Sequence, residues 1–81
     1  MPKFLDHHKV VSTAEMVEQS RKAIRAGTVA PNGVKGLNGF VAKGESWCLT
    51  EAPNAQAVHQ YHEAIGIKMG AGDVVEVTTI V

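Results

Sequence analysis

The stretch that decides the fold is residues 37–50, which read LNGFVAKGESWCLT. Two short apolar runs, 37–42 and 46–50, flank a Lys-Gly-Glu turn, and this pattern is typical of a β-hairpin. Gly36 and Gly39 weaken the first of these strands, because glycine has no side chain to pack, and they predict a bulge or a close backbone approach there. The middle of the chain is therefore predicted to be a two-stranded unit to which the flanking segments add.

A helix is predicted before the hairpin, over residues 13–26. Ser12 and Glu15 have the S-x-x-E spacing of a capping box, in which each side chain satisfies a free backbone N–H of the first turn. Gly27 is well placed to end the helix in the left-handed conformation. The apolar positions fall on one side of the helix, as in a surface helix that covers a sheet; they are Met16, Val17, Ala23 and Ile24.

A second helix is predicted after the hairpin, with Asn54 as its N-cap and Gly66 at its end. One face of this helix combines apolar residues with a histidine, namely Ala55, Val58, His62 and Ile65. Residues 3–10 and 73–81 are compatible with outer strands, and the second of these is rich in Val, Ile and Thr.

The order of predicted elements is β, α, β, β, α, β, which indicates a single α+β domain over residues 1–81. Two βαβ units joined through a hairpin form the ferredoxin-like sandwich, with both helices on one face of a four-stranded sheet. The last strand is apolar on both sides, with Val74 and Ile80 on one and Val75, Val77 and Val81 on the other. A sheet that is apolar on both faces needs a cover on both. We therefore expect a homodimer of the dimeric α+β barrel type.

The length supports the same expectation. A chain of 81 residues buries a modest share of its apolar surface, so a lone monomer is marginal. Cys48 is the only cysteine, which excludes a disulfide within the chain. Oligomerisation or a metal ion is the remaining means of support.

Charge and hydropathy narrow the function classes. Eight basic and eight acidic residues balance, and no basic run alternates with aromatic residues, so nucleic-acid binding is not expected. The amino terminus, MPKFLD, lacks the apolar centre of a signal peptide, and no apolar stretch is long enough to span a membrane. The sequence predicts a cytoplasmic protein without membrane association.

Four histidines occur in two pairs, and they are the candidate metal ligands. His59 and His62 lie three apart on the second predicted helix, a spacing that puts two imidazoles on one side, with Glu63 next to them. His7 and His8 are adjacent on a strand and point to opposite faces, so one of them faces outward. The alternative for His62 is a core histidine bonded to a backbone carbonyl.

Cys48 has no cationic neighbour in sequence that would lower its pKa, so a buried, unreactive thiol is the favoured interpretation. The glycines form neither a G-x-G-x-x-G motif nor a P-loop, and no nucleotide site is predicted.

Three segments of the chain resemble a family of small bacterial proteins, first described as a domain of unknown function. They are MPKFLD followed by histidine at residues 1–7, CLTEAP at 48–53 running into the helix with Ala57 and Val58, and DVVEV at 73–77. The resemblance implies a dimeric ferredoxin-like fold and nickel sequestration, as in the characterised actinobacterial member. It also implies metal ligands at His7 or His8 and at His59 or His62, whereas the Gly-rich residues 28–44 do not map onto the family.

Two functions from different classes follow. The first is a non-enzymatic metal-binding protein that buffers Ni²⁺, with Zn²⁺ or Co²⁺ as other candidates. The second is a small cofactor-free enzyme (a cyclase, isomerase or monooxygenase), in which histidine and tyrosine move protons inside a barrel cavity. This alternative requires that His8, Tyr61 and His62 share one pocket.

Overall fold

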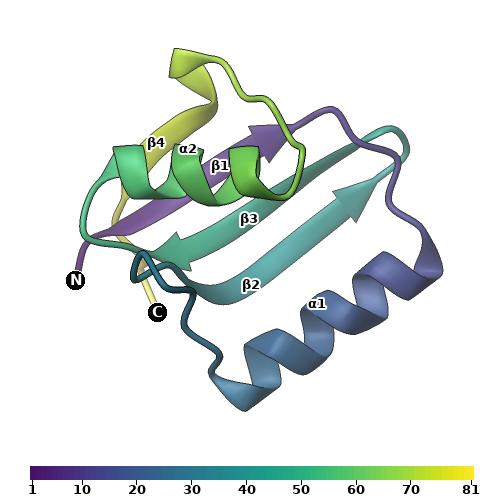
Figure 1. Cartoon of the computed structure of the whole chain (residues 1–81), viewed down its shortest axis with the longest axis horizontal. Coiled ribbons are helices and arrows are strands. Elements are labelled where there is room, and N and C mark those ends of the chain that lie inside the picture. The colour runs from purple at the N-terminus through teal and green to yellow at the C-terminus, as the bar shows by residue number, and fades with distance from the viewer.

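The fold is seen in a computed structural model, which describes residues 1–70 and 72–81 fully and the backbone course at Ala71. Four strands form one antiparallel sheet in the order β2-β3-β1-β4, with two helices and a short 3₁₀ turn (Figure 1). The elements in chain order are β1 (Lys3–His8), α1 (Ala14–Ala26), β2 (Lys35–Ala42), β3 (Glu45–Glu51), α2 (Ala55–Ala64), η1 (Ala71–Asp73) and β4 (Val74–Val77).

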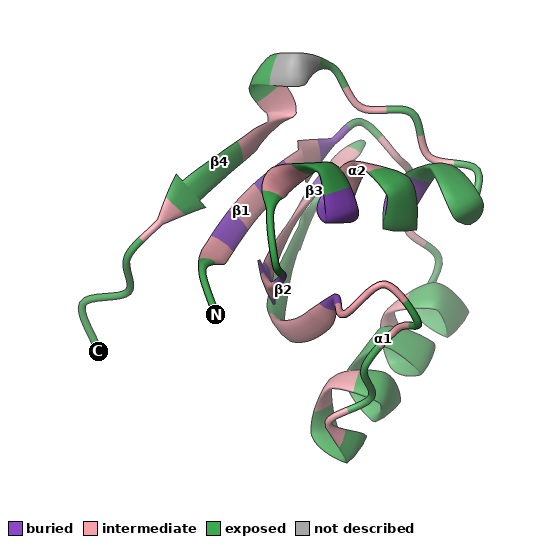
Figure 2. Ribbon diagram, turned by 60° about the vertical axis from the view of Figure 1, so that its left-hand side comes forward, coloured by how far each residue is buried: buried purple, intermediate pink, exposed green. Residues whose placement is uncertain are grey.

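Both helices lie on the same side of the sheet, and the other side is open (Figure 2). The element order and strand order are those of the ferredoxin-like fold, so the predicted architecture is confirmed. The hairpin is also confirmed: Ala42 pairs with Glu45 across a tight turn in which Gly44 has a φ of 81°. Such a positive φ favours glycine, because a Cβ atom would clash with the backbone.

The outer strands are shorter than predicted. β1 ends at His8 instead of residue 10, and β4 ends at Val77 instead of residue 81. Val77 pairs with Lys3, so any continuation of β4 would have to pair with residues 1 and 2. Residue 2 is Pro2, which has no N–H for a ladder hydrogen bond. Ile80, expected to share a covered face with Val74, is instead fully exposed.

The cap of α1 differs from the prediction by one residue. Thr13, not Ser12, is the N-cap: its backbone is extended and its Oγ1 accepts a hydrogen bond of 3.1 Å from the N–H of Met16. The capping box of Ser12 with Glu15 does not fit this register, because the helix begins one residue later than the motif requires. At the other end, Gly27 has a φ of 68° and ends the helix as predicted.

Gly36 shows both of the features expected of the weak strand. The pairing of β2 with β3 shifts register between Gly36 and Asn38, which is a bulge. A Cβ atom at Gly36 would also lie 3.2 Å from Cγ1 of Ile24 on α1. A side chain at this position would therefore crowd Ile24, where α1 packs against β2.

The interior of the described chain is unusually polar. The fully buried apolar residues are Phe4, Val34, Ala52, Ala57 and Val58, and equally many buried residues are polar: Asp6, His8, Ser46, Thr50 and His62. Burying polar groups costs free energy unless they find partners. Half of the buried residues of this small chain are therefore polar, which leaves fewer of them for apolar core packing.

Candidate metal centre

The site lies between the sheet and α2, and each of its side chains is positioned by regular structure. Side chains alternate along a strand, so Asp6 and His8 of β1 both point toward the helices. Cys48 on β3 is the register partner of Asp6 and points the same way. His62 comes down from α2, on the side of that helix that is buried with Val58. Three separate elements thus converge on one point.

The donor atoms of these four residues lie close together. One ligand atom each from Asp6, His8, Cys48 and His62 lies within 4.8 Å of every other. Oδ1 of Asp6 is 3.2 Å from Nε2 of His8 and 3.4 Å from Nε2 of His62. Sγ of Cys48 is 3.6 Å from Nε2 of His8. Tetrahedral bonds of the usual length separate neighbouring ligand atoms by about 3.3–3.8 Å, so these spacings suit a metal ion.

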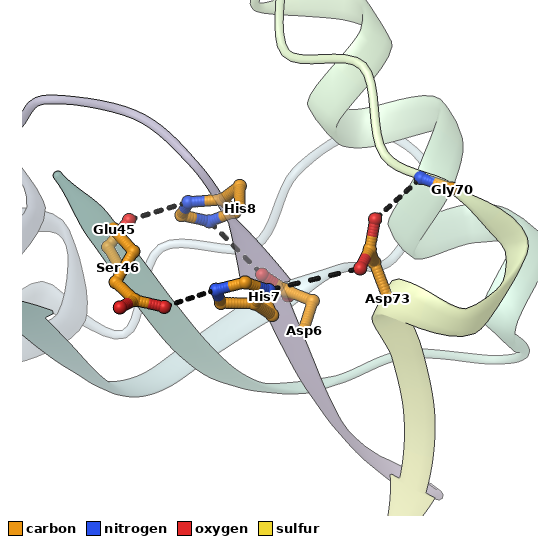
Figure 3. Close-up of polar contacts among 7 residues, drawn as sticks. All are labelled: Asp6, His7, His8, Glu45, Ser46, Gly70 and Asp73. Carbon is orange, nitrogen blue, oxygen red and sulfur yellow. Dashed lines mark hydrogen bonds and ion pairs between the residues drawn. The ribbon is translucent and has the colours of Figure 1, made fainter.

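Hydrogen bonds on the far side of each imidazole hold the rings in place. Nδ1 of His62 donates to the carbonyl oxygen of Val58 at 2.8 Å. A hydrogen bond of 2.6 Å joins Nδ1 of His8 to the hydroxyl of Ser46 (Figure 3). With its proton on Nδ1, neutral His62 directs the lone pair of Nε2 toward Asp6. Outer contacts of this kind orient metal-binding histidines.

Asp6 is the residue that sets the electrostatics of the site. Its side chain is fully buried, and neither oxygen has a hydrogen-bond partner among the described residues. A buried carboxylate without such partners is costly unless a positive charge or a proton stands beside it. Here the neighbours are ring nitrogens, one of which presents a lone pair, so the carboxylate and imidazole repel unless a cation lies between them.

Cys48 is partly buried, and its thiol is not a ready nucleophile. Burial, with the nearby Asp6 carboxylate as the smaller cause, raises the pKa of the thiol from 9.0 to about 12. The interpretation of Cys48 as an unreactive thiol is thereby supported. A metal ion would nevertheless take it as thiolate, because metal binding displaces the proton.

The structure brings together only part of the histidine set predicted from sequence. His8 and His62 meet, with ring centroids 5.2 Å apart. His7 points to the opposite face, where its Nε2 lies 2.8 Å from Glu45 and its Nδ1 lies 3.9 Å from Asp73 (Figure 3). His59 is half-buried and is outside the four-residue cluster. His62 also makes the backbone contact foreseen in the alternative interpretation, to Val58.

Sequence reasoning missed Asp6 and Cys48. Asp6 and His8 have the i, i+2 spacing that puts two side chains on one face of a strand, and this signal was available. Cys48 could be found only once the pairing of β1 with β3 was known. Among the described residues, these four form the one group of three or more potential ligands close enough to share an ion.

A cavity adjoins the cluster on the side of α1. Its volume is about 580 Å³, and His8, Tyr61 and His62 all contribute to its lining. The Tyr61 and His62 rings meet edge to face, with centroids 5.4 Å apart. The geometric condition for the cavity-enzyme alternative is therefore met.

Comparison with known proteins bears on the fold. A solved structure from Streptomyces coelicolor A3(2), that of the protein SCO4226, is similar over 98% of this chain and 99% of that one, with a TM-score of 0.70 and 29% sequence identity. The likeness supports the ferredoxin-like fold. No family model and no curated protein matches the chain. None of the helices in the described part of the chain is long and apolar enough to cross a membrane.

Proposed function

We propose that this protein binds a divalent transition-metal ion at Asp6, His8, Cys48 and His62, and that it sequesters or buffers that ion. The observation that carries the proposal is the position of Asp6. Its Oδ1 lies within 3.4 Å of Nε2 of His62 and 3.2 Å of Nε2 of His8, in a buried site. A divalent cation at this point would remove the repulsion between the carboxylate and the lone pair on Nε2 of His62.

Charge balance supports the same proposal. Two neutral imidazoles, one carboxylate and one thiolate carry a total charge of −2, which a divalent ion neutralises. Burial then favours the loaded state, because no net charge remains in a region of low dielectric. Four protein donors also resemble the closed sites that hold a metal, instead of the open ones that use it for catalysis. This favours storage or buffering over an enzymatic role.

Ni²⁺ is the metal that we propose first, on the strength of the family resemblance drawn from the sequence. Imidazole and thiolate donors also suit Zn²⁺, and divalent affinities at such sites increase from Co²⁺ to Ni²⁺. We therefore expect Zn²⁺ to bind comparably and Co²⁺ more weakly. The cobalt complex serves as a spectroscopic probe, since thiolate coordination produces charge-transfer absorption.

Calorimetric titration of tag-free protein with Ni²⁺ and Zn²⁺ tests the proposal. His62→Ala and His8→Ala each remove a donor and should weaken binding by about a hundredfold or more. His59→Ala and His7→Ala are matched controls on the same two elements, and they should leave the affinity of this site unchanged. Equal loss in His59→Ala and His62→Ala would restore the helix pair predicted from sequence. Absence of binding by the wild type would end the proposal.

We further propose that the working form is a homodimer. The open face of the sheet carries apolar side chains at register-matched positions on all four strands; Leu5, Phe40, Trp47, Leu49 and Val75 are among them. Phe40 and Val75 are more than half exposed in the single chain. A group of apolar side chains on an exposed face is typical of an interaction surface. A second copy is the partner that we propose for it.

The cavity enzyme is kept as a second candidate because of one observation, the shared lining of His8, Tyr61 and His62. In that case Asp6 would orient His62 as a proton carrier. A metal-binding result that depends on Asp6, His8 and Cys48 together favours the first proposal, since a proton-transfer site has no use for the thiol.

A further inference from the structure

The cavity beside the cluster is large for so small a chain, and the sequence explains why it is hollow. On the sheet side, several lining residues have small side chains; these are Gly36, Gly39, Ser46, Cys48 and Thr50. Sheets that pack against helices normally present large apolar side chains at such positions. Here β2 contributes glycine at two lining positions, and Val41 is a larger apolar residue that this strand adds to the lining.

On the opposite side, α1 presents an apolar face to this space. Met16, Val17 and Ile24 line the cavity, and none of the residues Ala14–Ala26, all of which the structure describes, is fully buried. Ile24 of the helix lies over Gly36 of the sheet. An amphipathic helix is ordinarily held by burying its apolar face. The side chains of the sheet therefore cover the apolar face of α1 only in part.

Polar atoms are placed sparingly around the apolar walls. Oγ1 of Thr50 is buried and has no hydrogen-bond partner among the described residues, although Thr50 belongs to the cavity lining. Tyr61, His8 and His62 belong to the same lining. An apolar pocket of about 300–1,000 Å³ with a few directed polar groups is the usual form of a small-molecule site.

From these observations we propose that the cavity between α1 and the sheet binds a small organic molecule with an apolar body and a neutral oxygen group, such as a hydroxyl or a carbonyl. The apolar body would cover Met16, Val17 and Ile24, and the oxygen would supply the missing partner of Thr50. A neutral oxygen matches the uncharged hydroxyl of Thr50. Arg21 and Arg25 also belong to the lining, so comparison with 2-naphthoate tests whether an anion binds there instead. The proposal does not depend on the metal site.

The direct test uses 2-naphthol, which is neutral at pH 7, with naphthalene and 2-naphthoate for comparison. Each compound is titrated into isotopically labelled protein while the methyl signals of Val17 and Ile24 and the amide signals of Gly36 and Gly39 are followed by NMR. We expect saturable shifts at these positions with 2-naphthol and weaker binding of the other two. Shifts on the open face of the sheet, or none up to the solubility limit, would overturn the proposal.

Variants on opposite walls keep the test independent of folding defects. Val17→Trp fills the cavity from the helix and Gly39→Leu fills it from the sheet, and each should weaken 2-naphthol binding by at least about tenfold. Lys22→Trp adds the same bulk on the exposed side of α1 and should bind as the wild type does. Unchanged binding in both filling variants would contradict the proposal, as would inter-chain contacts showing that a second copy covers α1.

Two further measurements test the role of the Thr50 hydroxyl and separate ligand binding from metal binding. Thr50→Val removes the hydroxyl at nearly constant volume, so it should weaken 2-naphthol binding several-fold and leave naphthalene unaffected. Ni²⁺ titration of Val17→Trp should match the wild type, because Val17 is outside the four-residue cluster. If Val17→Trp loses 2-naphthol binding but keeps metal binding, the ligand site and the metal site are independent of each other.

Discussion

Nε2 of His62 lies 3.4 Å from Oδ1 of Asp6, and both side chains are almost completely shielded from solvent. The two residues come from α2 and β1, and the hydrogen bond from Nδ1 of His62 to Val58 fixes which ring nitrogen faces the carboxylate. Two electron-rich atoms are thus held at close range inside the protein. The contact is unfavourable until a proton or a metal ion enters, and the proposed metal site rests on it.

Replacing Asp6 tests that relationship directly. Asp6→Asn keeps the volume but removes the charge, so we expect the metal-free protein to lose no stability and metal affinity to drop by about ten- to a hundredfold. Thermal melts with and without Ni²⁺ measure both effects. Glu63→Gln, an exposed carboxylate next to His62, is the control and should change neither. A strongly destabilised metal-free Asp6→Asn would show that the carboxylate has a structural role instead.

The thiol of Cys48 has a measurable pH signature. The folded chain holds its proton up to about pH 12, whereas the unfolded chain releases it near pH 9.0. The unfolded state therefore binds fewer protons between those values, and the free energy of unfolding decreases as pH rises through that window. The same burial predicts slow alkylation of the metal-free protein at pH 8. Comparison with Cys48→Ala isolates the effect: the decrease specific to the wild type should disappear.

Thr13 and its neighbour Ser12 should differ in how much each stabilises α1, because only Thr13 caps the helix. Thr13→Ala removes the side chain that accepts from the N–H of Met16 and should lower the free energy of unfolding by about 1 kcal/mol. Ser12→Ala lies one residue outside the cap and should have little effect. Urea denaturation of the two variants provides the measurement. The opposite ranking would mean that the capping box predicted from sequence forms after all.

If the dimer forms through the open face, a charge introduced on that face should disrupt the dimer, whereas the same charge elsewhere should not. Val75 and Val29 are 55% and 56% exposed, so a lysine at either position costs the single chain equally little. Val75 lies on the open face beside Leu5, and Val75→Lys should therefore convert a dimer to a monomer. Val29→Lys should leave the dimer intact. Light scattering after gel filtration reads the mass of each, and a monomeric wild type would refute the interface.

Local sequence patterns were sufficient for the type and order of the elements, though not for the ends of the outer strands, and through that order they were sufficient for the fold. Asn54 and Gly27 mark helix ends because their side-chain and backbone chemistry acts within one turn. The hairpin at Gly44 is similarly local. The element order then leaves few ways to form a sheet under two helices, and the ferredoxin-like arrangement is the one that the chain adopts.

The composition of the site was decided by tertiary structure. His59 and His62 are separated by about 60° around their helix, and only the packing of α2 on the sheet selects which of them is buried. Asp6 meets Cys48 through strand pairing, and His8 meets His62 through the seating of a helix on that strand pair. These contacts join residues far apart in the chain, and their formation depends on the balance of burial over the whole interior. The sequence by itself determined that histidines were available as ligands, and the fold decided which two of them, with which carboxylate and thiol, share one place.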